Sequence, residues 1–402
     1  MPCEPEFIRQ TLNTVFLQLS NKALNSIVRI LTYLNMKNLL VFILLFLNFS
    51  LFSQITMPAA GGNKKASVSE WIGITQVTIA YNRPGVNGRE GKIWGNLVHY
   101  GFKDLNYGTS KAAPWRAGAN ENTTVEFSTE VSIESKLLPA GKYGFFIAMG
   151  DEKATLVFSR FNTAWGSFYY DPKDDALRVD VPIKKSTENV ERLKYEFTQQ
   201  TETSAVIELQ WEKIRIPFNV SVGLQKLQIE SFRREFNSGQ FYQYWQNMHT
   251  AASYCLVNNI NLEEGLSWAD RSINTYFGET NFLTLSTYAG LLEKFNRTRE
   301  ADSLMQKAFP MATPLQLLLY GSNLNKMKQH KKAFDFFKMS YDKNPNENFS
   351  LLGMGMGYYF LENKKEAIQF AEKGKATATE NNWKSYFDSI INDLNAGKEM
   401  FK

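Results

Sequence analysis

The hydrophobic period of this 402-residue chain changes after Ser221, and the two parts on either side cannot share one fold class. In the first part apolar residues recur at every second position, as in Val77, Ile79 and Tyr81. This spacing is typical of strands with one buried face. In the second part they recur at intervals of three and four, which is typical of amphipathic helices. We therefore predict a β domain followed by a helical domain.

The predicted β domain contains about ten short apolar runs separated by Gly, Pro, Asn and Asp, including separate strands over 205–211 and 214–218. We expect an antiparallel β-sandwich, or a partly open barrel, over residues 57–220. The segment 221–239 is expected to be a linker or a first helix. One connection, from Asn82 to Asn122, is rich in aromatic residues and glycine. Connections of this length are usually functional, so this loop is the first candidate for a binding site.

The helical part repeats itself. Small residues occupy equivalent positions in the second helix of each predicted pair, with spacings of 36, 32 and 34 residues between Gly265, Ala301, Ala333 and Ala367. These spacings bracket the period of tetratricopeptide repeats, which is about 34 residues. Paired helices require small residues where they touch. Residues 240–402 are therefore expected to form a tetratricopeptide-like solenoid that ends in a capping helix.

A targeting segment precedes the β domain. From Met36 the sequence reads MKNLLVFILLFLNFSLFSQ, in which a lysine precedes the apolar run Leu39–Leu47 and small residues end at Ser53. This is the order of a secretory signal peptide, and the run is shorter than the roughly 20 residues of a spanning helix. We predict a signal peptide over 36–53, no stable membrane span after its cleavage, and export to the periplasm or the medium. Residues 1–35 are predicted to be a leader upstream of the true start.

Charge and metal-ligand content exclude several functional classes. The formal net charge is +5 and the basic residues are interspersed with acidic ones, so no nucleic-acid partner is expected. The two cysteines, Cys3 and Cys255, and the three scattered histidines predict no disulfide and no zinc site of His and Cys ligands. A carboxylate-based metal site stays open, and no metal ligand or cofactor is assigned. No serine elbow, P-loop or HExxH motif is present, so no catalytic residue is assigned. The GMGMG run at 353–357 is explained by helix packing.

Four separated motifs in the β part resemble the bacterial DUF2911 family: YNRPGVNGREGKIWGNLV, WRAGANENTTVEFS, LPAGKYGFF and FNTAWGSFYYD. The resemblance covers residues 57–220 and implies an exported β domain whose activity is unknown. Members of the family often carry a histidine after the YG of the third motif. This chain has Phe145 and Phe146 there, so no role of such a histidine carries over.

Polar and aromatic side chains gather around the long loop, and they make up the predicted ligand-binding set: Arg83, Arg89, Trp115, Arg116, Asn120, Glu121, Thr124 and Trp165. Guanidinium, amide and carboxylate groups suit a carboxylate, a phosphate or a sugar, and Trp94, Trp115 and Trp165 would suit a sugar ring. The competing interpretation is structural. In it the polar groups fasten the loop, with Arg116 paired to Glu121, and the tryptophans fill the core.

We expect an exported binding or scaffolding protein. Its β domain would bind a small-molecule or carbohydrate ligand, and its repeats would dock a partner protein along their concave face. The alternative is an envelope hydrolase acting on carbohydrate or peptide, with Glu121 as acid or base and Arg116 and Asn120 holding the substrate. In a third interpretation, the β domain only stabilises the repeats. Whether the protein is an enzyme stays open at this point, although no catalytic motif supports it.

Overall fold

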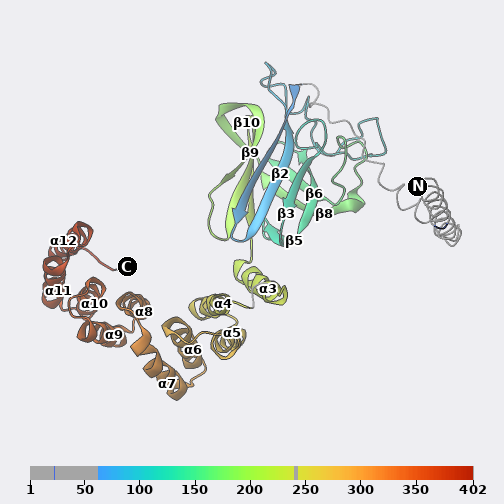
Figure 1. The fold of residues 1–402 in the computed structure, drawn as a ribbon. Helices are drawn as coiled ribbons and strands as arrows, with labels where there is room; N and C mark the ends of the chain where they lie inside the picture. Colours follow the sequence, from blue (N-terminus) through green and yellow to red (C-terminus); the bar gives the residue numbers. More distant parts are fainter. Residues whose placement is uncertain (1–21, 23–61, 240–242, 402) are drawn as a thin grey trace, which may run out of the picture. The chain divides into compact units, whose positions relative to one another are not determined.

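The computed structural model describes Lys22, residues 62–239 and residues 243–401. The predicted signal peptide lies outside these residues, as does the predicted leader except for Lys22. Within the described part, ten strands precede ten α-helices, as the change in hydrophobic period predicts (Figure 1). No helix of the described part is long and apolar enough to cross a membrane.

Two antiparallel sheets make up the β domain (Figure 1). One has six strands in the order β1-β2-β3-β6-β7-β8, and the other has four in the order β5-β4-β10-β9. They remain two separate sheets and do not close into a barrel, so the sandwich prediction is confirmed. The strands are β1 (Lys64–Ile72), β2 (Thr75–Arg83), β3 (Thr123–Phe127), β4 (Val131–Ile133), β5 (Lys136–Leu138), β6 (Gly141–Met149), β7 (Lys153–Ser159), β8 (Asp175–Pro182), β9 (Lys184–Thr198) and β10 (Ser204–Ser221).

The two sheets share one hydrophobic core that is rich in aromatic rings. Phe145 and Phe158 of the six-stranded sheet contact Phe218 of the four-stranded sheet, with ring centroids 5.7 and 6.3 Å apart. All three side chains are buried. Burial of one such side chain stabilises a fold by about 1.5–3 kcal/mol, so this cluster is a main source of cohesion between the sheets.

Strand β10 contains a bulge. The sequence predicted two strands here, over 205–211 and 214–218, whereas the structure has one continuous strand. Glu212 has a φ of +50°, and the register with β9 shifts on both sides of it. The buried positions change from odd numbers, such as Trp211, to even numbers, such as Phe218. Side chains therefore alternate in opposite phase before and after Glu212, and both halves of the strand keep their apolar side chains in the core.

Helix α3 comes first in the helical part, and four pairs follow it: α4/α5, α6/α7, α8/α9 and α10/α11. The two helices of each pair pack together, and α12 packs on α11. The predicted small residues Gly265, Ala301, Ala333 and Ala367 are all buried in the second helix of a pair, so the repeat prediction is confirmed. The helices are α3 (Leu224–Asn237), α4 (Trp245–Asn258), α5 (Leu262–Asn274), α6 (Phe282–Lys294), α7 (Thr298–Ala308), α8 (Pro314–Lys326), α9 (His330–Lys343), α10 (Asn348–Phe360), α11 (Lys364–Thr377) and α12 (Asn381–Asn395).

Phe337 of α9 explains why glycine recurs in the neighbouring helices. Its ring is fully buried, and three glycines lie against it: Gly321 of α8, and Gly353 and Gly357 of α10. A Cβ atom on Gly321 would lie 2.3 Å from Cε1 of Phe337, and one on Gly353 would lie 2.9 Å from Cδ1. Both distances are too short for carbon atoms. The GMGMG run therefore has a packing role within α10.

We expect Gly321→Ala to destabilise the protein. The clash with Phe337 costs about 1–3 kcal/mol and exceeds the gain in helix propensity of about 1 kcal/mol. Gly355→Ala is the matched control, because its new Cβ would meet Ala367 O at 3.5 Å, an ordinary contact. Urea unfolding of both variants should show a loss of stability for the first and none for the second. Equal effects of the two substitutions would contradict the packing role.

Candidate functional site

Backbone bridges fix the long loop between β2 and β3 to the β domain. Trp115 exchanges two hydrogen bonds with Ile147 of β6, at N···O distances of 2.9 and 2.8 Å. Glu121 pairs in the same antiparallel manner with Trp165. The loop therefore has a defined course, and its last residues lie beside the connection that follows β7.

Four of the eight predicted site residues meet at this junction: Arg116, Asn120, Glu121 and Trp165. Arg116 Nη1 donates to the carbonyl oxygen of Asn120 at 2.7 Å. Glu121 Oε2 accepts a hydrogen bond of 2.8 Å from Asn82 Nδ2. The Trp165 side chain is 56% exposed beside them. The junction thus combines a cation, a carboxylate, two amides and an exposed indole ring.

The guanidinium group of Arg116 is half-buried between two loop segments. Its central carbon lies 5.4 Å from the centre of the Phe168 ring, and a Cβ on Gly166 would lie 2.9 Å from that carbon. Burial lowers the pKa of Arg116 from its ordinary value. Arg116 thus contacts both loops through the Asn120 carbonyl and the Phe168 ring, while the pairing of Arg116 with Glu121 stays a prediction.

Arg83 and Arg89 also donate to backbone carbonyls. Arg83 Nε donates to the carbonyl of Leu193 in β9 at 2.9 Å. Arg89 Nε and Nη2 donate to the carbonyls of Val86 and Gly85 at 3.0 and 2.8 Å. These contacts fasten the beginning of the loop, as the structural interpretation predicts. None of these three hydrogen bonds joins the arginines to the junction around Glu121.

The three loop tryptophans do not share one surface. Trp94 and Trp115 pack edge to face with centroids 5.8 Å apart, and both contact Trp211 of β10. Trp115 is buried, whereas Trp165 is exposed. The predicted sugar platform is therefore reduced to Trp165. Thr124 lies within β3, where it pairs with neighbouring strands.

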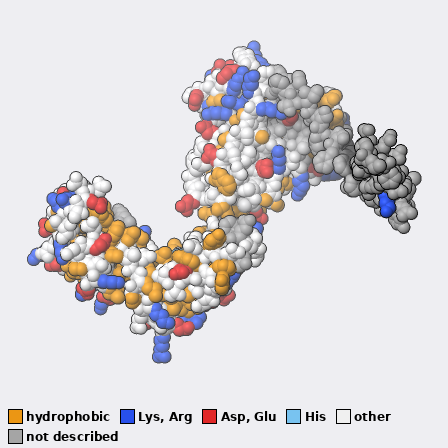
Figure 2. Space-filling model, in the orientation of Figure 1, with side chains coloured by type: hydrophobic (Ala, Val, Ile, Leu, Met, Phe, Trp, Pro, Cys, Tyr) orange, Lys and Arg blue, Asp and Glu red, His pale blue; other side chains and the backbone are white. Residues whose placement is uncertain are grey.

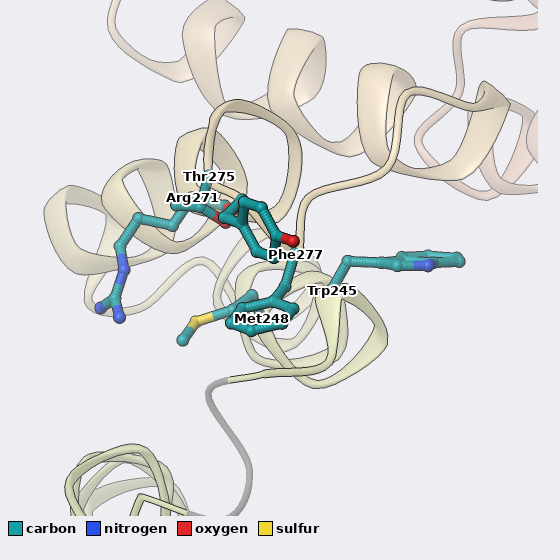
Figure 3. Close-up of a pocket in the computed structure, with 6 residues that line it drawn as sticks. Trp245, Met248, Arg271, Thr275 and Phe277 are labelled. Atoms are coloured by element: carbon teal, nitrogen blue, oxygen red, sulfur yellow. The ribbon is translucent and has the colours of Figure 1, made fainter.

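A second candidate site lies in the first helix pair of the repeats (Figure 3). It is a pocket of about 220 Å³ lined by Trp245, Met248, Arg271, Thr275, Tyr276 and Phe277. Figure 3 shows Trp245 and Arg271 extending to opposite sides of the site. Small-molecule pockets usually measure about 300–1,000 Å³. This smaller, largely apolar pocket suits one large side chain.

The rim of this pocket exposes aromatic surface to solvent. Tyr276 and Phe277 follow α5 directly, and their side chains are 94% and 41% exposed. Their rings pack edge to face with centroids 5.0 Å apart. Arg271 is also exposed, and it forms no ion pair with a residue of 62–239 or 243–401. The rim therefore offers two aromatic rings and one positive charge.

Apolar side chains are also exposed on α8, the first helix of a later pair. Leu315 and Leu319 lie one turn apart on α8, and both side chains are exposed. Figure 2 shows hydrophobic side chains distributed over the visible surface of the helical part.

His249 lies next to the pocket on α4. Its Nε2 atom is 3.0 Å from Thr287 Oγ1 of α6, and its ring is 6.2 Å from the Trp245 ring. Burial lowers the pKa of His249 from its ordinary value. The neutral imidazole is therefore favoured in the folded protein, because burial disfavours the charged form.

Several of these residues were not predicted as site residues. Trp245, Tyr276 and Phe277 lie at the ends of helices, and aromatic residues on a short polar connection are the signal that would have found them. Asn82 and Phe168 belong to two of the motifs quoted above. They were missed because their side-chain contacts join segments that are distant in sequence.

A comparison with known protein families matches the β part of the chain. Residues 63–220 match the model of the family described as "Protein of unknown function (DUF2911)", so the resemblance predicted from the sequence is confirmed there. No curated protein matches the chain significantly.

Two solved structures of helical proteins are similar to part of the chain. The first is "Crystal structure of YrrB: a TPR protein with an unusual peptide-binding site", with 13% identity, 41% of this chain and 83% of that chain covered, and a TM-score of 0.24. The second is "Crystal structure of MamA", with 11% identity, coverage of 39% and 94%, and a TM-score of 0.25. Such scores describe a loose likeness, and the helix pairs themselves define the repeats.

We expect the protein to lose stability as the pH falls below about 6.5. In that range the unfolded chain binds a proton at His249 that the folded chain does not, so the free energy of unfolding decreases with decreasing pH. His249→Gln should make this dependence shallower in urea unfolding between about pH 5 and pH 8. Burial also lowers the pKa of His99, so both proteins should carry His99→Gln. An unchanged slope would contradict the assignment.

Proposed function

We propose that this protein is an exported scaffold that binds a partner protein through its helical repeats. The observation that carries the proposal is the pocket between α4 and α5, whose volume of about 220 Å³ suits a single large apolar side chain. Protein interfaces often depend on a few such anchors, which enter well-packed pockets and carry most of the binding energy.

The surroundings of the pocket support a protein ligand. The Tyr276 side chain is 94% exposed, so its ring adds little to the stability of the fold. Exposed tyrosine, tryptophan and arginine are enriched at interfaces. The charge of Arg271 favours an acidic residue close to the anchor. The preferred partner segment therefore carries a large apolar side chain and a nearby carboxylate.

The β domain supports ligand binding less well. The guanidinium groups of Arg83, Arg89 and Arg116 all donate to backbone carbonyls of this chain. A ligand that used them would have to replace those hydrogen bonds. We therefore assign partner binding to the repeats, and we assign no substrate to the junction around Glu121.

Phe277→Asp should abolish partner binding, because it places a charge at the rim of the apolar pocket. Val257→Asp is the matched control: it adds the same charge to the same helix pair, at a side chain that is 68% exposed and does not line the pocket. Full-length proteins would be immobilised and exposed to an envelope fraction of the source organism. We expect the first variant to capture at least about tenfold less partner, since one hot spot contributes 2 kcal/mol or more. Equal capture by both variants would refute the proposal.

Export depends on the segment 36–53. When the full chain is expressed in a bacterial host, we expect the mature protein outside the inner membrane, with Gln54 as its first residue. Leu44→Arg should retain the precursor in the cytoplasm, because a charge interrupts the apolar run. Cell fractionation and N-terminal sequencing measure both outcomes. An unprocessed wild-type chain in the cytoplasm would exclude export by this signal.

A further inference from the structure

The chain turns back sharply after α12. Gly397 has a φ of +70° and donates its N–H to the carbonyl of Leu394 at 3.1 Å. The N–H of Lys398 donates to the carbonyl of Asp393 at 3.0 Å, and its Nζ pairs with the Asp393 carboxylate at 2.7 Å. These bonds fix the direction in which the following residues leave the helix.

The residues after this turn lie against Tyr359 of α10. The backbone N–H of Met400 donates to Tyr359 Oη at 3.1 Å. The ring of Phe401 packs edge to face on the ring of Tyr359, with centroids 5.5 Å apart. Both apolar side chains are half-buried against the core of the repeats. Met400 and Phe401 are therefore held on α10 by a backbone hydrogen bond and by side-chain contacts.

The segment 397–401 is not required to close the core of the repeats. Phe387, Ile390 and Leu394 of α12 are buried and already cover the last helix pair. An open cavity of about 520 Å³ remains beside the segment, lined by Tyr359 and Phe360 among others. Gly397, Lys398 and Glu399 line this cavity as well, so one side of the segment faces open space, whereas the apolar side chains of α12 are buried.

We propose that the segment 397–401 occupies a peptide-binding site on α10, and that a partner segment with the same chemistry displaces it. This chemistry is an apolar residue followed by an aromatic residue, as in Met400 and Phe401. The proposal rests on the partner-binding function proposed for the repeats, but it uses a surface at the other end of them.

The covalent connection gives the segment an advantage over a free peptide. A short tether produces an effective concentration on the order of millimolar. A peptide supplied at micromolar concentration therefore competes poorly with the segment in the wild-type chain. Removal of the two apolar side chains should free the site and raise the affinity for a peptide in solution.

The test uses the full chain and a fluorescent peptide, GKEMFK, which has the sequence of residues 397–402. Fluorescence anisotropy should show at least tenfold tighter binding to the variant Met400→Ala/Phe401→Ala than to the wild type. Addition of Tyr359→Phe to this variant should weaken binding, because it removes only the hydroxyl that accepts the backbone hydrogen bond. The peptide GKEMSK, which lacks the aromatic ring, is the control and should bind weakly.

The outcomes separate a binding site from a structural cap. If the segment is only a cap, the double variant unfolds at a lower temperature and does not bind the peptide, and this result would overturn the proposal. Equal affinity of the wild type and the double variant would also overturn it. The assay involves no pocket residue of α4 or α5. A failure of the Phe277→Asp experiment would therefore count against the proposed partner site and not against this one.

Discussion

The close approach of paired helices is the constraint on which the helical part depends. At several helix contacts a residue with little or no side chain faces a larger one. Gly265 of α5 faces Cys255 of α4, and Gly374 of α11 faces Phe387 of α12, with Cβ positions that would lie 2.7 and 2.4 Å from the neighbour. Phe337 is the extreme case, because it meets glycines of two helices. These contacts let the helices approach closely.

The sequence predicted the features that depend on local spacing. The change of period after Ser221 and the buried small residues of the repeats follow from the geometry of single strands and helices, and the structure confirms both. The joining of two predicted strands into β10 was not predictable, because it depends on the positive φ of Glu212. The pocket between α4 and α5 was missed for a similar reason. It forms where a helix meets the connection that follows the next helix, and no single period describes that contact.

The candidate site in the β domain shows what residue types alone do not reveal. Arginine and glutamate near one loop suggested either ligand binding or an ion pair. In the structure Arg116 donates to a carbonyl that is aimed at it by the backbone of Asn120, whose φ is +58°. A backbone acceptor is present at every residue and has no signature in the sequence. The repeats are therefore the better candidate for a binding surface, because they expose aromatic side chains such as Tyr276.

The glycines around Phe337 also limit how this chain can diverge. Gly321 and Gly353 have no side chain that could adapt to a residue of another size at position 337. Such a substitution therefore requires a second one at a neighbouring position. Gly290 is different, because its nearest neighbour is the flexible side chain of Leu256, which can adapt to a single substitution. Sequence drift should accordingly be slower at the contacts of Phe337 with α8 and α10 than at Gly290 of α6. The surface of α10 should therefore also change slowly in sequence, whatever it binds.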